Sequence, residues 1–232
     1  MRSTAFPSIS RWRGWSHRVG DVAGRWLELG ILYVIAPSAF AWLVRRFDYR
    51  GAMFPLLWIL TALCLWLLLR SPTFDRDLLL SLPLTHPHLR VVAVRFCVSV
   101  AALAIVSRVT APAWFLWLPR QRPGLWWTLV FGYPWASALP QGIIWRVFFV
   151  HRYAQLFDHV TLLAVGGAAF GIAHLTFRNP IAIAMTAVGG VIFLDTYLAT
   201  RSMLLATLEH GAYGIMVFTF GLGRYVYLAA RP

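Results

Sequence analysis

The residues in this sequence that could carry chemistry are ionisable and polar side chains inside strongly apolar segments. They fall in three short clusters, which are Gln141 to Arg146, Phe170 to His174, and Glu209 with His210. An ionisable group in an apolar helix is costly, so such groups usually face one another and mark a functional site. Imidazole, carboxylate and guanidinium groups are also those used for proton transfer and oxyanion stabilisation. We therefore expect Arg146, His174 and His210 to point into one cavity.

The metal chemistry of these residues is less well defined by the sequence. His174 and His210 could both ligate a divalent metal such as zinc, but two ligands are fewer than the three of a usual catalytic zinc site. The chain has neither an HExxH motif nor a GxSxG motif, which argues against a zincin and against a serine hydrolase of that type. The sequence leaves open whether any cofactor is needed.

The amino-acid composition indicates which kind of secondary structure positions these ionisable and polar side chains. The chain has 232 residues, of which 59% are hydrophobic and only 12% are charged, and its mean hydropathy is +0.67. A soluble domain of this size has about twice as much charge. The sequence therefore predicts an all-α, multi-pass transmembrane helical bundle. Apolar segments of sufficient length to span a bilayer lie at about 26–44, 52–69, 90–112, 125–150, 160–176, 180–199 and 203–221.

The basic residues fit this interpretation. All 21 are arginines, against 8 acidic residues, and they lie mostly at the ends of apolar segments, where they can reach lipid headgroups. No nucleic-acid-binding motif accompanies them, so we expect membrane lipids and no nucleic acid as partners. We expect an integral protein of the bacterial cytoplasmic membrane. The arginine distribution favours a cytoplasmic N-terminus only slightly.

Two regions are expected along the chain. Residues 1–25 are rich in Arg and Trp, and the spacing of Trp12, Trp15, Val19, Val22 and Trp26 predicts the apolar face of an interfacial amphipathic helix. Residues 26–232 are expected to form a single membrane domain. Within it, Gly166, Gly167 and Gly171 would let a neighbouring helix approach closely.

On these motifs the sequence resembles the CPBP intramembrane proteases, which include the CAAX prenyl endopeptidases and the abortive-infection proteins. Their signature is EExxxR, then FxxxH, then HxxxN or HxxxD. Phe170 and His174 match the second motif, whereas Arg146 and His210 match the Arg of the first and the His of the third. The resemblance covers about 125–223. It implies an endopeptidase acting on a hydrophobic or lipid-modified peptide or protein, with catalytic roles at Arg146, His174 and His210. We also expect substrate contacts from Phe170 and from Asp195, which lies on a neighbouring apolar segment.

The sequence departs from the family pattern at three positions. Gln141 and Gly142 stand where the family has two glutamates, and Gly214 stands where it has Asn or Asp. The family implies that a glutamate activates water, and Gln141 could only position it. Glu209 or Asp195 could replace the missing base. The first hypothesis is therefore an active endopeptidase. The alternative is a catalytically impaired pseudoprotease that acts as a membrane binding or scaffold protein. A third and weaker hypothesis is a transporter or channel subunit.

Overall fold

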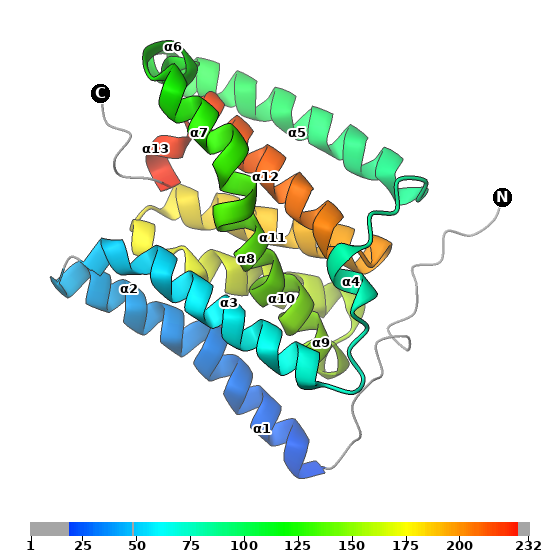
Figure 1. Ribbon diagram of the computed structural model, residues 1–232. Helices are drawn as coiled ribbons and strands as arrows, with labels where there is room; N and C mark the ends of the chain where they lie inside the picture. The colour runs from blue at the N-terminus through cyan, green and yellow to red at the C-terminus, as the bar shows by residue number, and fades with distance from the viewer. Residues whose placement is uncertain (1–18, 48, 227–232) are drawn as a thin grey trace.

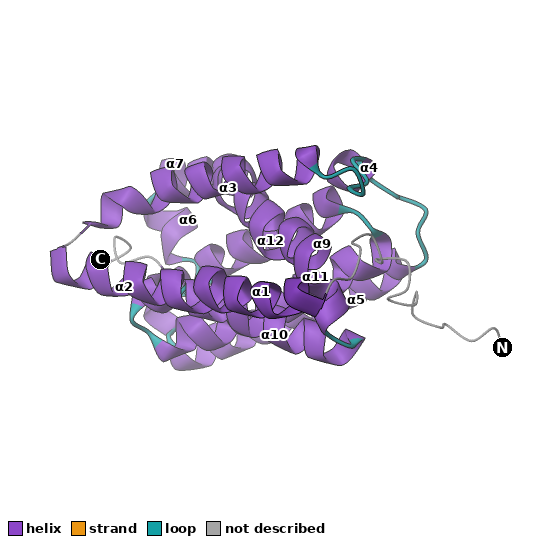
Figure 2. Cartoon of the chain, turned by 90° about the horizontal axis from the view of Figure 1, so that it is seen from below, coloured by secondary structure: helices purple, strands orange, loops and turns teal. Residues whose placement is uncertain are grey.

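The computed structural model describes residues 19–47 and 49–226, and every regular element among them is a helix. The predicted all-helical membrane bundle is thereby confirmed (Figures 1 and 2). The described helices include five that are long and apolar enough to cross a membrane, at Val22–Phe47, Met53–Arg70, His88–Thr110, His159–Phe177 and Pro180–Thr200. The remaining two of the seven expected segments are also helical, over 123–153 and Met203–Thr219.

The amino-terminal part of the bundle consists of three long helical segments. The first combines α1 (Val19–Gly30) and α2 (Ala36–Phe47) through a π-helical turn at Ile31–Ile35, and is followed by α3 (Met53–Arg70) and α5 (His88–Thr110). A short helix, α4 (Asp77–Leu80), lies between α3 and α5. Trp12 and Trp15 of the expected interfacial helix lie outside the described residues. Val22 and Trp26 are exposed on α1, and Arg25 is buried.

The carboxyl-terminal part starts with α6 (Trp117–Gln121) and a long, irregular helical segment. This segment runs through α7 (Pro123–Tyr133), α8 (Leu139–Gly142) and α9 (Phe149–Tyr153), with π-helical turns at Pro134–Ala138 and Ile143–Phe148. Helices α10 (His159–Ala173), α11 (Pro180–Thr200) and α12 (Met203–Thr219) come next, and α13 (Gly223–Val226) ends the described chain. In Figure 1, α11 and α12 lie in the middle of the bundle, between α5 and α10.

Local sequence explains why α10, α11 and α12 start where they do. Asp158, Asn179 and Ser202 each accept a hydrogen bond from a backbone N–H in the first turn of the next helix, which satisfies donors that a helix leaves unpaired.

Glycines in α10 allow α10 and α11 to pack closely. A Cβ at Gly167 would lie 2.4 Å from Val191 Cγ2 and 2.9 Å from the carbonyl oxygen of Ala187. The close approach predicted from these small residues is therefore present.

Candidate active site

The centre of the candidate site is a contact between Arg146 and His210. Arg146 lies in the π-helical turn at Ile143–Phe148, His210 lies in α12, and their Nη2 and Nδ1 atoms are 3.2 Å apart. Arg146 is 1% exposed and His210 is 5% exposed. Because a guanidinium can only donate hydrogen bonds, Nδ1 of His210 accepts, and its proton is on Nε2. The contact thus sets the tautomer of a buried imidazole.

The second nitrogen of His210 contacts a residue that the sequence motifs do not include. The hydroxyl of Tyr133, at the end of α7, lies 3.2 Å from Nε2 of His210. With the proton on Nε2, the imidazole donates to the phenolic oxygen. Tyr133 also lies where a side chain at Gly214 would extend, since a Cβ at position 214 would be 2.2 Å from Cε1 of the tyrosine. Tyr133 therefore occupies the space in which the resembled family has its Asn or Asp.

Aromatic rings enclose this pair of residues. Phe193 of α11 stacks on His210 with 4.6 Å between the ring centroids, and Phe170 of α10 meets the same imidazole edge-on at 5.6 Å. The guanidinium of Arg146 lies 5.0 Å from the Phe193 centroid and 5.7 Å from that of Phe170. Rings at these distances attract the cation and exclude water. In this conformation the Arg146–His210 pair is closed to solvent.

His174 joins the cluster through Phe170. Its ring centroid is 4.7 Å from that of Phe170, so the two imidazoles face the same aromatic ring from α10 and α12. His174 comes directly after the last residue of α10, and its Nδ1 is 2.7 Å from the carbonyl oxygen of Phe170. A carbonyl only accepts, so Nδ1 carries the proton and Nε2 is an available acceptor. Unlike Arg146 and His210, His174 is only half-buried.

The segment that matches the EExxxR motif has the arginine, Arg146, but neither of the two glutamates. Gln141 donates from Nε2 to Ser137 Oγ over 2.8 Å, while its buried Oε1 has no hydrogen-bond partner among the described residues. A Cβ at Gly142 would lie 2.7 Å from Thr207 Oγ1 and 3.3 Å from Arg146 Nη1. That Nη1 is also buried without a hydrogen-bond partner in the described part of the chain. Thr207 therefore blocks the space that a side chain at position 142 would need. The neighbouring guanidinium nitrogen, Arg146 Nη1, has no carboxylate to bind among the described residues.

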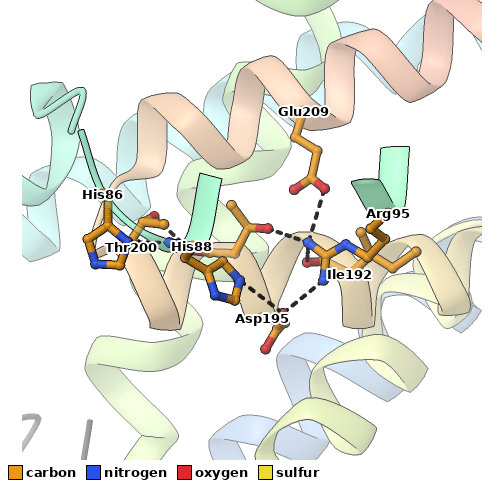
Figure 3. Close-up of polar contacts among 8 residues, drawn as sticks. His86, His88, Arg95, Ile192, Asp195, Thr200 and Glu209 are labelled. Atoms are coloured by element: carbon orange, nitrogen blue, oxygen red, sulfur yellow. Dashed lines mark hydrogen bonds and ion pairs between the residues drawn. The ribbon is translucent and has the colours of Figure 1, made fainter. Parts of the chain in front are cut away.

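Glu209 and Asp195 belong to a second cluster, which is centred on Arg95 of α5 (Figure 3). Arg95 Nη1 lies 2.8 Å from Asp195 Oδ2, and its Nη2 lies 3.0 Å from Glu209 Oε1. The same Nη2 donates to Thr196 Oγ1 and to the carbonyl oxygen of Ile192. His88 Nε2 is 3.5 Å from Asp195 Oδ2. Glu209 is thus directed toward α5, although it adjoins His210 in sequence.

The predicted site residues therefore separate into two groups. Arg146, His174, His210 and Phe170 form one cluster, and Glu209 and Asp195 form the other with Arg95. The two groups adjoin through α11, where Phe193 contacts His210 and Thr196 contacts Arg95. Tyr133, Thr207 and Arg95 were not among the predicted residues. One sequence signal could have indicated Arg95. It is an arginine within an apolar segment, and two other apolar segments contain an acidic residue with which it could pair.

The described residues do not provide a metal site at the histidines. Between residues 19 and 226, leaving aside Asp48, no three His, Cys, Asp or Glu side chains come together in a way that could hold a metal ion. Nδ1 of His210 faces the Arg146 guanidinium, which repels a second cation.

One comparison with known protein families matches the carboxyl-terminal part of the chain. Residues 122–216 match the family model described as Rce1-like, type II CAAX prenyl endopeptidase. The matched segment contains all three motif clusters, and it starts after α5, which contributes Arg95. Neither the curated proteins nor the solved structures gave a match to this chain.

Proposed function

We propose that this integral membrane protein binds prenylated or otherwise membrane-associated peptides and does not cleave them by the family mechanism, because residues 122–216 match the family model described as Rce1-like, type II CAAX prenyl endopeptidase. In that mechanism a glutamate on the helix of Arg146 would accept a proton from water. Binding would use the family scaffold, with the half-buried His174 at its edge and the buried Phe170 packed against that imidazole. The finer location, the bacterial cytoplasmic membrane, stays a prediction.

The observation that carries the proposal is the filled space beside Gly142. A general base must lie within hydrogen-bond reach of the water that it deprotonates. At position 142 the chain has no side chain, and a Cβ built there would lie only 2.7 Å from Thr207 Oγ1. Gln141 cannot accept a proton at neutral pH. The carboxylate of Glu209 pairs with Arg95, so it is not directed at His174.

The remaining groups still suit peptide binding. Arg146 Nη1 is a buried, charged donor without a hydrogen-bond partner among the described residues, and Nε2 of His174 is an available acceptor. A peptide has both carbonyl acceptors and N–H donors, so it can bind the half-buried His174 directly and Arg146 once the aromatic rings that enclose the guanidinium move apart. Binding without proton abstraction is the function that this set of groups supports.

The second candidate function is an endopeptidase that uses a relocated base. It is favoured by Glu209 Oε2, which is buried and has no hydrogen-bond partner within the described residues, one position from His210. If Glu209 left Arg95, its carboxylate could serve as a proton acceptor next to an imidazole. This function requires a rearrangement of α5 or α12 that separates Glu209 from Arg95, in addition to the opening that any peptide needs in order to reach the buried Arg146.

One experiment separates the two functions. Purified protein in lipid nanodiscs is mixed with a fluorescent farnesylated CAAX peptide, and its unfarnesylated counterpart is the control. Anisotropy reports binding, and chromatography reports cleavage. We expect saturable binding of the farnesylated peptide with no product. Equal binding of both peptides would contradict the proposal, and so would product formation that is lost in both His174→Ala and Glu209→Gln, which would instead support the relocated base.

A further inference from the structure

The arginines within residues 19–47 and 49–226 are distributed differently at the two ends of the bundle. At the end where α2 and α5 finish and where α10 turns into α11, the described residues have exposed arginines and no acidic side chain, while Asp48 lies outside the described residues. This end lies at the left of Figure 1. We define it as the basic end, and its exposed arginines are Arg45, Arg46, Arg108, Arg120, Arg122 and Arg178.

The opposite end neutralises much of its charge internally. Arg152 binds Glu28 through two nitrogens, at 2.6 to 3.2 Å, and Arg201 Nη2 lies 3.0 Å from Asp75 Oδ2. Asp77, the first residue of α4, and Asp158, the residue before α10, lie at the same end. At the basic end, by contrast, no hydrogen bond or ion pair joins the guanidinium groups of the six arginines to another described residue. Their charge is therefore directed outward.

The surroundings of these arginines place them at the depth of lipid headgroups. Trp42, which is 51% exposed, precedes Arg45 and Arg46 by about one helical turn, and Trp127, also 51% exposed, lies five residues after Arg122. Tryptophan is enriched where a membrane protein crosses from hydrocarbon to water. Helix α2 also packs against the turn at Leu175–Phe177 that precedes Arg178. Arg45, Arg46 and Arg178 are thus close enough to bind headgroups in the same patch of the membrane.

We propose that the basic end binds the headgroups of anionic phospholipids. A phosphodiester or phosphatidyl anion matches guanidinium donors in charge and in geometry. The apolar exterior of the helices keeps this end beside lipid, so lipid phosphate is its nearest source of negative charge. The half-buried His174 lies one turn of chain before Arg178, so a bound anionic lipid would border the candidate site. This proposal holds whether or not the protein cleaves peptides.

The test uses the full chain purified in a neutral detergent, with phosphatidylglycerol or phosphatidylcholine added. A ligand that binds only the folded protein raises its apparent unfolding temperature. The test variant is Arg45→Gln/Arg46→Gln/Arg178→Gln. The matched control is Arg70→Gln/Arg76→Gln/Arg90→Gln, which removes three exposed arginines from the opposite end.

We expect phosphatidylglycerol to raise the unfolding temperature of the natural chain and of the control variant, with no comparable rise for the test variant. The rise should shrink when salt is increased from about 50 mM to 500 mM, because exposed charges are screened. Native mass spectrometry should show fewer retained phosphatidylglycerol molecules on the test variant than on the control. A full rise for the test variant, an equal loss in both variants, or no rise for the natural chain would each overturn the proposal.

Discussion

The ring of Tyr133 occupies the space that a side chain at Gly214 would need. A Cβ built at Gly214 would lie 2.2 Å from Cε1 of the tyrosine and 2.9 Å from its hydroxyl oxygen. That hydroxyl contacts His210. The two positions are therefore complementary, because the large residue on α7 requires the small residue on α12.

The first prediction tests this complementarity. Gly214→Asn, which introduces the family residue, should lower the stability of the protein by about 1–3 kcal/mol, the usual cost of overpacking. Tyr133→Ala in the same chain should relieve part of that loss. Thermal unfolding of the two single variants and the double variant measures the coupling. If the effects simply added, the two residues would not compete for one space.

The second prediction concerns the missing glutamate. Gly142→Glu alone should fold poorly, because its Cβ would lie 2.7 Å from Thr207 Oγ1. Gly142→Glu/Thr207→Ala should be tolerated and should place a carboxylate beside Arg146 Nη1. We expect this double variant, with or without Gln141→Glu, to cleave a prenylated reporter at least about 10²-fold faster than the natural chain, the lower range for a general base.

Two controls accompany the second prediction. Gly142→Ala and Gly142→Ala/Thr207→Ala isolate the steric part, and the second should be the more stable of the two. Adding His174→Ala to the glutamate variant should abolish the gained activity. Gained cleavage that persisted without His174 would mean that the inferred site is not the one responsible.

The third prediction concerns Arg95. Arg95→Met leaves the carboxylates of Asp195 and Glu209 without their guanidinium partner, and Glu209 is 5% exposed. Because breaking a buried ion pair strands a charge, we expect a loss of about 3 kcal/mol. Adding Glu209→Gln and Asp195→Asn should recover part of it. Arg90→Met, at an exposed position one turn earlier on α5, should change stability by less than about 0.5 kcal/mol. Equal effects of Arg95→Met and Arg90→Met would argue against the cluster.

The fourth prediction concerns Tyr33, which supports the segment that carries Arg146. Its buried hydroxyl donates to the carbonyl oxygen of Ile144 over 2.8 Å. Tyr33→Phe keeps the ring and removes the donor, so it should cost about 1 kcal/mol. Tyr225→Phe, near the end of the described chain, is a control that should have little effect. Unchanged unfolding of Tyr33→Phe would show that the hydrogen bond contributes no stability.

Much of the fold could be predicted from the sequence because apolar length alone defines membrane helices. The segments at 52–69, 90–112 and 180–199 each lie within about two residues of the helices observed. The Phe170–His174 pair could be predicted from its spacing of one turn. The partners Tyr133, Thr207 and Arg95 could not, because they depend on how separate helices pack. The Arg95–Glu209 contact joins residues that are 114 positions apart.

The two π-helical turns in the segment 123–153 affect how the number of residues in this segment can vary. A turn with i→i+5 hydrogen bonds contains more residues than an α-helical turn, so it accommodates an inserted residue without a break in the helix. Deleting one residue from Ile143–Phe148 would restore ordinary winding with little rotation of the helix before the deletion relative to the helix after it, because a wide turn covers about the same angle as an α-helical turn with one more residue. Gln141 and Gly142 would then keep their neighbours, whereas the side chains inside the turn, Arg146 among them, would be redirected. A change in chain length by one residue is thus a route by which relatives of this protein could redirect the side chains of this turn while the rest of the bundle stays in place.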